Sequence, residues 1–425
     1  MSGYVPVLDS EYIIDGVRME LTPRQILEEA AGTASDMNGS IVSHTDGSPD
    51  MERTISGNVG AGEPLVDESL DPAPDSEPFD KARIHDYLKL TSAAAGKPRN
   101  IPAFCPEETT RAEIASALIE NIWKTGHFKL DDIILDLTWE WDTAPVGNIA
   151  AFYKSVEAAC SCLDMLGIRL GEYGFTECAG GCRIRASAHV EKSCEDRCDI
   201  DDEPADIAET IDREILNTPE MNPAMPQYEM PFRTARPVIG KSRKCPAHIS
   251  GEESSWLIYI PFDTCKFRLG GSLLAERTGK SGGKAPEAED YDYFLDCYEV
   301  VREFVEDGVI VSGTTTGAGG LMPALNRMTT KARGIDADIS GISRSYGETD
   351  IVKLLFGEVP GIVVEIRDSD FDYVDAEMLL QDVAYYPLGH PGKPGLRITS
   401  GGQGGIAGIL QTLLGQEDIV PEGED

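Results

Sequence analysis

Leu269-Gly270-Gly271-Ser272 is the first of four glycine-rich joints that alternate with short apolar runs in residues 256–372. Three further joints follow it: Gly317-Ala318-Gly319-Gly320-Leu321, Gly334-Ile335-Asp336-Ala337-Asp338-Ile339 and Leu354-Leu355-Phe356-Gly357-Glu358-Val359-Pro360-Gly361. Glycine placed just before an apolar run indicates a tight turn or a backbone brought close to a ligand. The pattern therefore predicts turns between packed elements, some of which could line a site.

The apolar runs around these joints predict alternating strands and helices. Their spacing follows a period of two in the strands and of about 3.6 in the helices. The expected order is a strand at 256–262, a helix at 291–305 closed by Gly308, a strand at 309–311, a loop at 312–320, a helix at 321–328, a strand at 335–339, a helix at 352–356, a strand at 362–366, a helix at 374–381, and a terminal strand and helix. This part of the chain should fold as one unit of mixed helix and sheet.

The region before residue 191 shows a second set of elements. Thr110-Arg111-Ala112-Glu113 matches a capping box, so a helix is expected to begin there. Residues 133–140 alternate apolar and polar side chains and predict a strand with one buried face. A helix is expected over 149–166, ended by Gly167, and a second alternating strand over 184–190. The order helix, strand, helix, strand predicts an α+β or α/β layer.

Shifts in composition suggest where these units begin and end. Residues 32–80 are rich in Gly, Ser, Pro, Asp and Glu, with too few apolar side chains to offset the loss of chain entropy. The expected organisation is a short helical segment at 1–31, a disordered acidic linker at 32–80, a truncated half-domain at 81–190, an acidic and proline-rich connection at 191–254, a second half-domain at 255–415, and an acidic tail at 416–425.

The charge balance restricts the class of partner. The chain of 425 residues has 37 basic and 74 acidic side chains, a net charge of -37. Such a chain repels phosphate backbones and anionic membrane surfaces, so no nucleic-acid or membrane partner is expected. No apolar stretch reaches about 18 residues, and no secretory signal follows Met1. The ten cysteines are therefore expected to be reduced thiols in a cytoplasm.

The order of the motifs resembles a known family. A Leu-Gly-Gly-Ser joint, a helix, a short strand, Gly-Gly-Leu at a helix start, Gly-Ile-Asp-Ala-Asp-Ile and Leu-Phe-Gly-Glu-Val-Pro-Gly are similar to the C-terminal half-domain of the aminoimidazole ribonucleotide synthetase-like superfamily. Trp139 and the helix from Phe152 to Gly167 resemble the preceding half-domain. Within the superfamily, the phosphoribosylformylglycinamidine synthase family of purine biosynthesis matches best. The resemblance covers residues 108–190 and 255–390.

The resemblance carries expectations about architecture and activity. It implies an α+β fold of two half-domains, each a mixed sheet with flanking helices, and a homodimer in which a barrel forms between copies. It implies binding of ATP, with magnesium on the nucleotide phosphates, and of a ribosyl-phosphate substrate. An active member would be an ATP-dependent C–N ligase that receives ammonia from a separate glutaminase partner.

The chain departs from the family at the phosphate and metal loop. The family has Asp-Xaa-Ser-Asp-Gly-Gly-Leu, whereas this chain has Thr315-Thr316-Gly317-Ala318-Gly319-Gly320-Leu321. Thr315 and Ala318 replace both aspartates, and neither can supply the anionic oxygen that magnesium prefers. The alternative is therefore a catalytically inactive scaffold or regulator, and no catalytic or metal-binding residue is assigned.

Several residues are candidates for a phosphate or ligand site. Backbone N–H groups of glycine-rich turns at helix starts favour anions. The candidates are Gly270, Gly271, Ser272, Thr315, Gly319, Gly320 and Glu358. The alternative is that the glycines only make turns and that Glu358 is a surface glutamate rather than one that orients a ligand or caps a turn.

Four cysteines and two aspartates could be mistaken for site residues. Cys178, Cys182, Cys194 and Cys198 form two Cys-Xaa3-Cys pairs, whose spacing differs from the usual zinc-binding Cys-Xaa2-Cys, so free thiols are expected. Asp336 and Asp338 alternate with apolar residues and should point to solvent.

Overall fold

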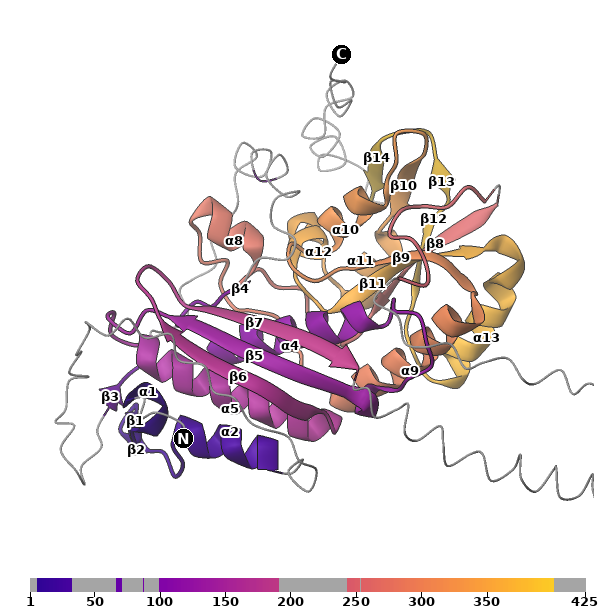
Figure 1. Cartoon of the computed structure of the whole chain (residues 1–425). Helices are drawn as coiled ribbons and strands as arrows, with labels where there is room; N and C mark the ends of the chain where they lie inside the picture. The colour runs from indigo at the N-terminus through magenta and orange to yellow at the C-terminus, as the bar shows by residue number, and fades with distance from the viewer. Residues whose placement is uncertain are drawn as a thin grey trace, which may run out of the picture.

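The computed structural model describes residues 6–32, 66–70, 87, 99–190, 243–252 and 254–400. Two units of mixed helix and sheet lie side by side, with a small N-terminal unit packed beneath the first (Figure 1). The predicted α+β class is confirmed.

The first half-domain is a four-stranded sheet with two helices on one face (Figure 1). The strand order is β4-β7-β5-β6, with β5 parallel to β6 and antiparallel to β7. The bounds are β4 Arg99–Asn100, α4 Pro106–Asn121, β5 Ile133–Trp141, α5 Asn148–Leu166, β6 Arg169–Glu177 and β7 Arg183–Val190, with a 3-10 turn η2 at Leu130–Asp132. Alternate residues of β5 from Ile133 to Trp141 are fully buried against the helices, as a strand with one buried face requires.

This half-domain confirms three predicted elements and corrects one. Strands β5 and β7 and helix α5, which ends at Gly167 in the left-handed conformation, agree with the sequence. Helix α4 begins at Pro106, four residues before the predicted capping box, because proline is favoured in the first turn of a helix. Thr110 instead lies inside the helix, where its hydroxyl contacts that of Ser155 (2.7 Å).

The N-terminal unit consists of two short helices and a three-stranded sheet ordered β2-β1-β3. Its bounds are α1 Pro6–Asp9, β1 Tyr12–Ile14, β2 Val17–Arg18, α2 Pro23–Gly32 and β3 Val66–Glu68. The ring of Tyr12 packs on that of Tyr153 in α5, with centroids 5.0 Å apart. Strand β3 falls inside the predicted linker 32–80 and pairs with β1, so the prediction of disorder is wrong for residues 66–68. Most of the rest of that linker lies outside the described residues.

The second half-domain is built on an antiparallel sheet ordered β12-β8-β11-β9. The bounds are β8 Ser255–Pro261, α9 Tyr291–Asp307, β9 Ile310–Thr315, α10 Leu321–Met328, α12 Ile351–Phe356, β11 Gly361–Arg367 and β12 Tyr386–Gly389. Ile362 and Val364 of β11 face α9 and the first half-domain, whereas Val363 faces α10 and α12. Both faces are buried, which explains why β11 is continuously apolar rather than alternating.

A small sheet, β13-β10-β14, completes this half-domain. The remaining bounds are α8 Leu273–Thr278, β10 Gly334–Asp338, α11 Ser340–Tyr346, α13 Phe371–Leu380, β13 Pro391–Gly392 and β14 Leu396–Thr399, with a 3-10 turn η4 at Asp368–Asp370. The predicted strands and helices from residue 256 to 381 are confirmed, and Asp336 and Asp338 are exposed as expected. The predicted loop at 312–320 is shorter, because β9 continues to Thr315. The predicted terminal helix lies outside the described residues.

Residues 243–252, here called the strap, connect the two half-domains. The N–H of Lys244 donates to the carbonyl of Trp123 at the end of α4 (2.6 Å). The carbonyl of Pro246 accepts from the N–H of Gly313 on β9 (2.9 Å), and the N–H of Ile249 donates to Met328 (2.9 Å). The strap therefore covers the edge of β9 and ties it to the first half-domain, which protects an otherwise open sheet edge.

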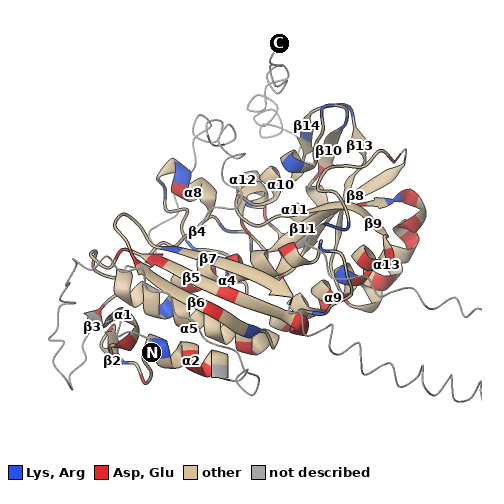
Figure 2. Ribbon diagram, viewed as in Figure 1, with Lys and Arg blue, Asp and Glu red and all other residues tan. Residues whose placement is uncertain are grey.

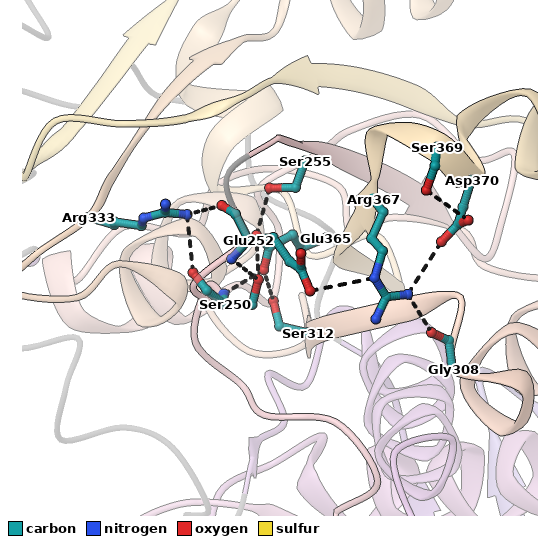
Figure 3. Close-up of polar contacts among 10 residues, drawn as sticks. All are labelled: Ser250, Glu252, Ser255, Gly308, Ser312, Arg333, Glu365, Arg367, Ser369 and Asp370. Carbon is teal, nitrogen blue, oxygen red and sulfur yellow. Dashed lines mark hydrogen bonds and ion pairs between the residues drawn. The ribbon is translucent and has the colours of Figure 1, made fainter.

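A buried carboxylate holds the strap in place (Figure 3). Glu365 of β11 is fully buried and accepts hydrogen bonds from the N–H of Ser250 (2.6 Å) and from the hydroxyls of Ser250 (3.0 Å), Ser255 (2.7 Å) and Ser312 (2.8 Å). Arg333 donates to the carbonyls of Ser250 and Glu252 from the other side. These contacts satisfy a charge whose burial would otherwise be costly.

Acidic side chains lie on many elements, among them the outer helices α9 and α13 (Figure 2). Helix α9 exposes five carboxylates at helical spacing: Asp292, Asp296, Glu299, Glu303 and Asp307. Neighbouring α13 is also acidic, as Figure 2 shows. Within the described part of the chain, no helix is long and apolar enough to cross a membrane.

Candidate functional site

A cleft of about 350 Å³ opens where the two half-domains meet. The first half-domain contributes the ends of β4, β5 and β7 and one residue of α4, and the second contributes α8 and three loops. The lining residues are Arg99, Asn100, Glu113, Glu140, Arg183, Gly271, Leu273, Glu276, Arg277, Ala318 and Glu358. Three of the predicted glycine-rich joints thus reach one cleft, although they are far apart in the sequence.

Glu358 lies at the base of this cleft and is only 2% exposed, so the alternative of a surface glutamate is wrong. Its Oε1 accepts hydrogen bonds from the backbone N–H groups of Leu273 and Gly319, each 2.7 Å long. Its Oε2 forms a buried ion pair with Arg99 of β4. One carboxylate thereby joins the start of α8, the Gly319 turn and the first half-domain.

The predicted glycine-rich joints make their own main-chain contacts. The N–H of Gly270 donates to Lys284 (2.9 Å), and that of Gly320 donates to Gly317 (3.0 Å). The Ser272 hydroxyl oxygen accepts from Ala275 N–H (3.2 Å) and caps α8. Of these predicted residues, only Gly271 and Glu358 line the cleft within the described structure, and the Gly319 amide already binds Glu358.

Gly320 shows why these joints need glycine. Its φ is +76°, and a Cβ placed there would lie 2.8 Å from the carbonyl oxygen of Gly357. Gly320→Ala is therefore expected to destabilise the fold by about 2 kcal/mol or more, from backbone strain plus a contact with rigid main chain. Gly347 has φ +60°, but a Cβ at that position would meet no atom within 4 Å, so Gly347→Ala should cost only about 1 kcal/mol. Urea unfolding of both variants measures the difference, and equal losses would contradict the close contact at Gly320.

Thr315 lies at the end of β9, away from the cleft. Its hydroxyl donates to Glu120 (2.7 Å) and accepts from the indole N–H of Trp123 (3.0 Å). Its carbonyl accepts from Arg327 (2.6 Å). Ala318, the other position that carries aspartate in the family motif, does line the cleft. The structure therefore brings together Gly271, Ala318 and Glu358 but not Thr315.

The charged residues of the cleft include several that the sequence did not reveal. Arg183 lies 3.6 Å from Glu140, and both are half-exposed at the ends of neighbouring strands. Burial raises the pKa of Glu113 on α4. The alternation of apolar and polar residues along β5 and β7 places Glu140 and Arg183 on the outer face of the sheet. This alternation is the only sequence signal from which their position could have been predicted. Arg99 lies in a two-residue strand that shows no periodicity.

Comparison of sequences with known proteins shows similarity to phosphoribosylformylglycinamidine synthases over a limited region. No family model matches the chain. The chain is 28% identical over 141 residues to the probable phosphoribosylformylglycinamidine synthase, chloroplastic/mitochondrial, of Arabidopsis thaliana, and 25% identical over 140 residues to the human phosphoribosylformylglycinamidine synthase. The chain is a divergent relative of these synthases. The resemblance expected from its motifs is confirmed.

The similarity covers only part of each protein. Each of the two matches spans 33% of this chain and 10% of the synthase. Among solved structures, PurL from Thermotoga maritima complexed with FGAR has a TM-score of 0.48 and 8% identity, over 75% of this chain and 48% of that one. The same protein complexed with AMPPCP has a TM-score of 0.42 and 9% identity, over 70% and 39% of the two chains.

Magnesium, which the synthase resemblance implies, does not fit the residues of the cleft. The Oε1 of Glu358 accepts hydrogen bonds from two backbone N–H groups. Its Oε2 is paired with the guanidinium group of Arg99, whose positive charge would repel a metal cation. The part of the chain that the structure describes contains no group of three or more His, Cys, Asp or Glu able to hold a metal. Cys178 and Cys182 instead donate to the carbonyls of Gly181 (3.5 Å) and Asp142 (3.9 Å), whereas Cys194 and Cys198 lie outside the described residues.

Proposed function

We propose that this chain is a phosphoribosylformylglycinamidine synthase-related protein of purine metabolism that binds a small phosphorylated ligand, a ribosyl phosphate or a nucleotide, without carrying out the ligase reaction. The cleft between the half-domains is the binding site. The observation that carries this proposal is the engagement of Glu358 by Arg99 and two backbone amides.

The size and lining of the cleft support binding of a small molecule. A volume of about 350 Å³ is within the range of small-ligand sites, roughly 300–1,000 Å³. Arg99, Arg183 and Arg277 supply guanidinium groups, whose planar donors match phosphate oxygens. The overall charge of -37 opposes an anionic ligand at long range, but salt screens this repulsion and the local arginines act at contact distance.

The same geometry argues against ATP-dependent ligation. Ala318 supplies no carboxylate where the family motif has an aspartate, and Thr315 is held by Glu120 and Trp123. Glu358, the carboxylate of the Leu-Phe-Gly-Glu-Val-Pro-Gly joint, is engaged by Arg99 and two backbone N–H groups. These residues do not form the anionic set that a magnesium–nucleotide pair requires. The homodimer, the glutaminase partner and the cytoplasmic location stay predictions.

An assay of ATP turnover tests the absence of ligase chemistry. The purified chain is incubated with magnesium, ATP, formylglycinamide ribonucleotide and ammonia, and ADP release is followed. We expect no release above that of the ammonia-free mixture, because the phosphate loop lacks its anionic ligands. Ammonia-dependent ADP release that is lost in Arg277→Ala, an exposed cleft residue, would show that the chain is an active ligase.

A further inference from the structure

Arg99 contributes its guanidinium group to the wall of the cleft. The residue is 9% exposed, lines the cleft and uses one terminal nitrogen, Nη2, to pair with Glu358. Its Nε is buried and has no hydrogen-bond partner among the described residues. That nitrogen is closed off from the cleft, so a ligand would contact the rest of the guanidinium group, which lines the cleft beside Glu358.

Two more guanidinium groups reach the same cleft from separate elements. Arg277 extends from α8 of the second half-domain and is exposed. Arg183 begins β7 of the first half-domain, and its side chain is 39% exposed beside Glu140 at 3.6 Å. Asn100, next to Arg99 on β4, adds an amide to the lining. Cationic donors therefore approach the cleft from both half-domains.

The alternative anion site, at the backbone amides of the glycine-rich joints, is already filled. The N–H groups of Leu273 and Gly319 both donate to Glu358 Oε1 at 2.7 Å. An incoming anion would have to displace a buried carboxylate that is also paired with Arg99. Displacement would leave Oε1 of that carboxylate without its two backbone donors, so binding at the arginines is favoured.

We propose that the anionic group of the ligand is a phosphate held between the guanidinium groups of Arg99, Arg183 and Arg277, and not by the glycine-rich joints. A phosphate offers three or more acceptor oxygens and up to two negative charges, which three guanidinium groups can share. A single carboxylate offers two oxygens and one charge and would leave donors unused. The biological ligand rests on the proposed function, but the phosphate site itself does not.

The remaining carboxyl groups of the cleft suit the rest of such a ligand. Glu113, Glu140 and Glu276 come from α4, β5 and α8. Ionised carboxylates accept hydrogen bonds and so would bind hydroxyl or amino groups rather than a second anion. The ligand class is therefore a phosphomonoester that also carries hydrogen-bond donors.

Titration of the full chain with inorganic phosphate tests the site without assuming the biological ligand. Calorimetry is performed on the unmodified protein, Arg183→Ala, Arg277→Ala and the control Arg344→Ala, an exposed arginine of α11 outside the cleft. Arg183 and Arg277 are not buried, so both variants should fold, which circular dichroism checks. Loss of one charged hydrogen-bond donor is expected to weaken phosphate binding by about tenfold in each cleft variant and not in the control.

Competition with acetate and titration with ribose 5-phosphate distinguish failure of the arginine site from failure of the proposed function. No phosphate binding, or equal binding by all four proteins, overturns the arginine site. Acetate that competes as strongly as phosphate shows a carboxylate site and also overturns it. If ribose 5-phosphate binds equally to all four proteins, the arginine site is rejected but the proposed function stands. If inorganic phosphate binds in an arginine-dependent way and ribose 5-phosphate does not bind at all, the arginine site is supported and the proposed function is rejected.

Discussion

Glu358→Ala is expected to destabilise the protein by about 3–5 kcal/mol, since removing one partner of a buried ion pair leaves the other charge uncompensated. The pair joins Glu358 of the second half-domain to Arg99 of the first, and the substitution also removes the acceptor of two backbone N–H groups. Chemical unfolding followed by circular dichroism measures the loss. A second expected effect is weaker order at the starts of α8 and α10, which hydrogen exchange of residues 271–275 and 317–321 would detect.

Two variants make this measurement specific. Glu358→Gln keeps an acceptor for the amides but loses the charge opposite Arg99, so its stability should fall between the parent and Glu358→Ala. Glu276→Ala removes an exposed carboxylate from the same cleft and should change stability by no more than about 0.5 kcal/mol. If Glu358→Ala were no less stable than Glu276→Ala, the buried pair would not hold the half-domains together.

Glu365→Ala is expected to cost about 3 kcal/mol or more, because several buried donors lose their common acceptor at once. Ser250, Ser255 and Ser312 all donate to this carboxylate, and Ser250 belongs to the strap. The loss should therefore appear both in global stability and in faster proteolysis of residues 243–252. Urea unfolding and limited proteolysis measure the two effects.

The control for this prediction is a single donor of the same network. Ser312→Ala removes one hydroxyl and leaves Glu365 with three hydrogen bonds, so it should cost only about 1 kcal/mol. Proteolysis of the strap in Ser312→Ala should remain close to that of the parent. Equal losses of stability in Glu365→Ala and Ser312→Ala would mean that the Glu365 carboxylate is not the common acceptor on which these hydrogen bonds depend.

Local periodicity was sufficient to predict the elements that form the two cores. Helices α5 and α9 each carry an apolar face and end at a glycine, Gly167 and Gly308, so both their extent and their ends were visible in the sequence. Strands β5 and β11 were equally clear, since one alternates and the other is apolar throughout. These features depend only on neighbouring residues.

Strand β6 was not predicted because its alternation is interrupted. Leu170 is buried, but the next buried side chain is Tyr173, and the pairing with β5 shifts register between Leu135 and Leu137. A β-bulge of this kind changes the face on which later residues point, so a strict period of two fails. Strand β3 was missed for a different reason, since three residues in a polar segment give no periodic signal.

The candidate site was only partly predictable. Glycine-rich joints marked the loops at Gly271 and Ala318, which do line the cleft, because unusual backbone conformations leave a trace in the sequence. The burial of Glu358 could not be predicted from the sequence, since it depends on Arg99, which lies 259 residues away along the chain. Arg183 and Arg277 reach the cleft only because two half-domains pack together, and no local pattern records that contact.

The central claim is that the cleft binds a phosphorylated small molecule through side chains of the protein and without a magnesium–nucleotide pair. Calorimetric titration of the full chain with ribose 5-phosphate, with and without magnesium, tests this most directly. The account predicts saturable binding of one molecule per chain with the same affinity in both conditions. Absence of binding, or binding that appears only when magnesium is added, would contradict it.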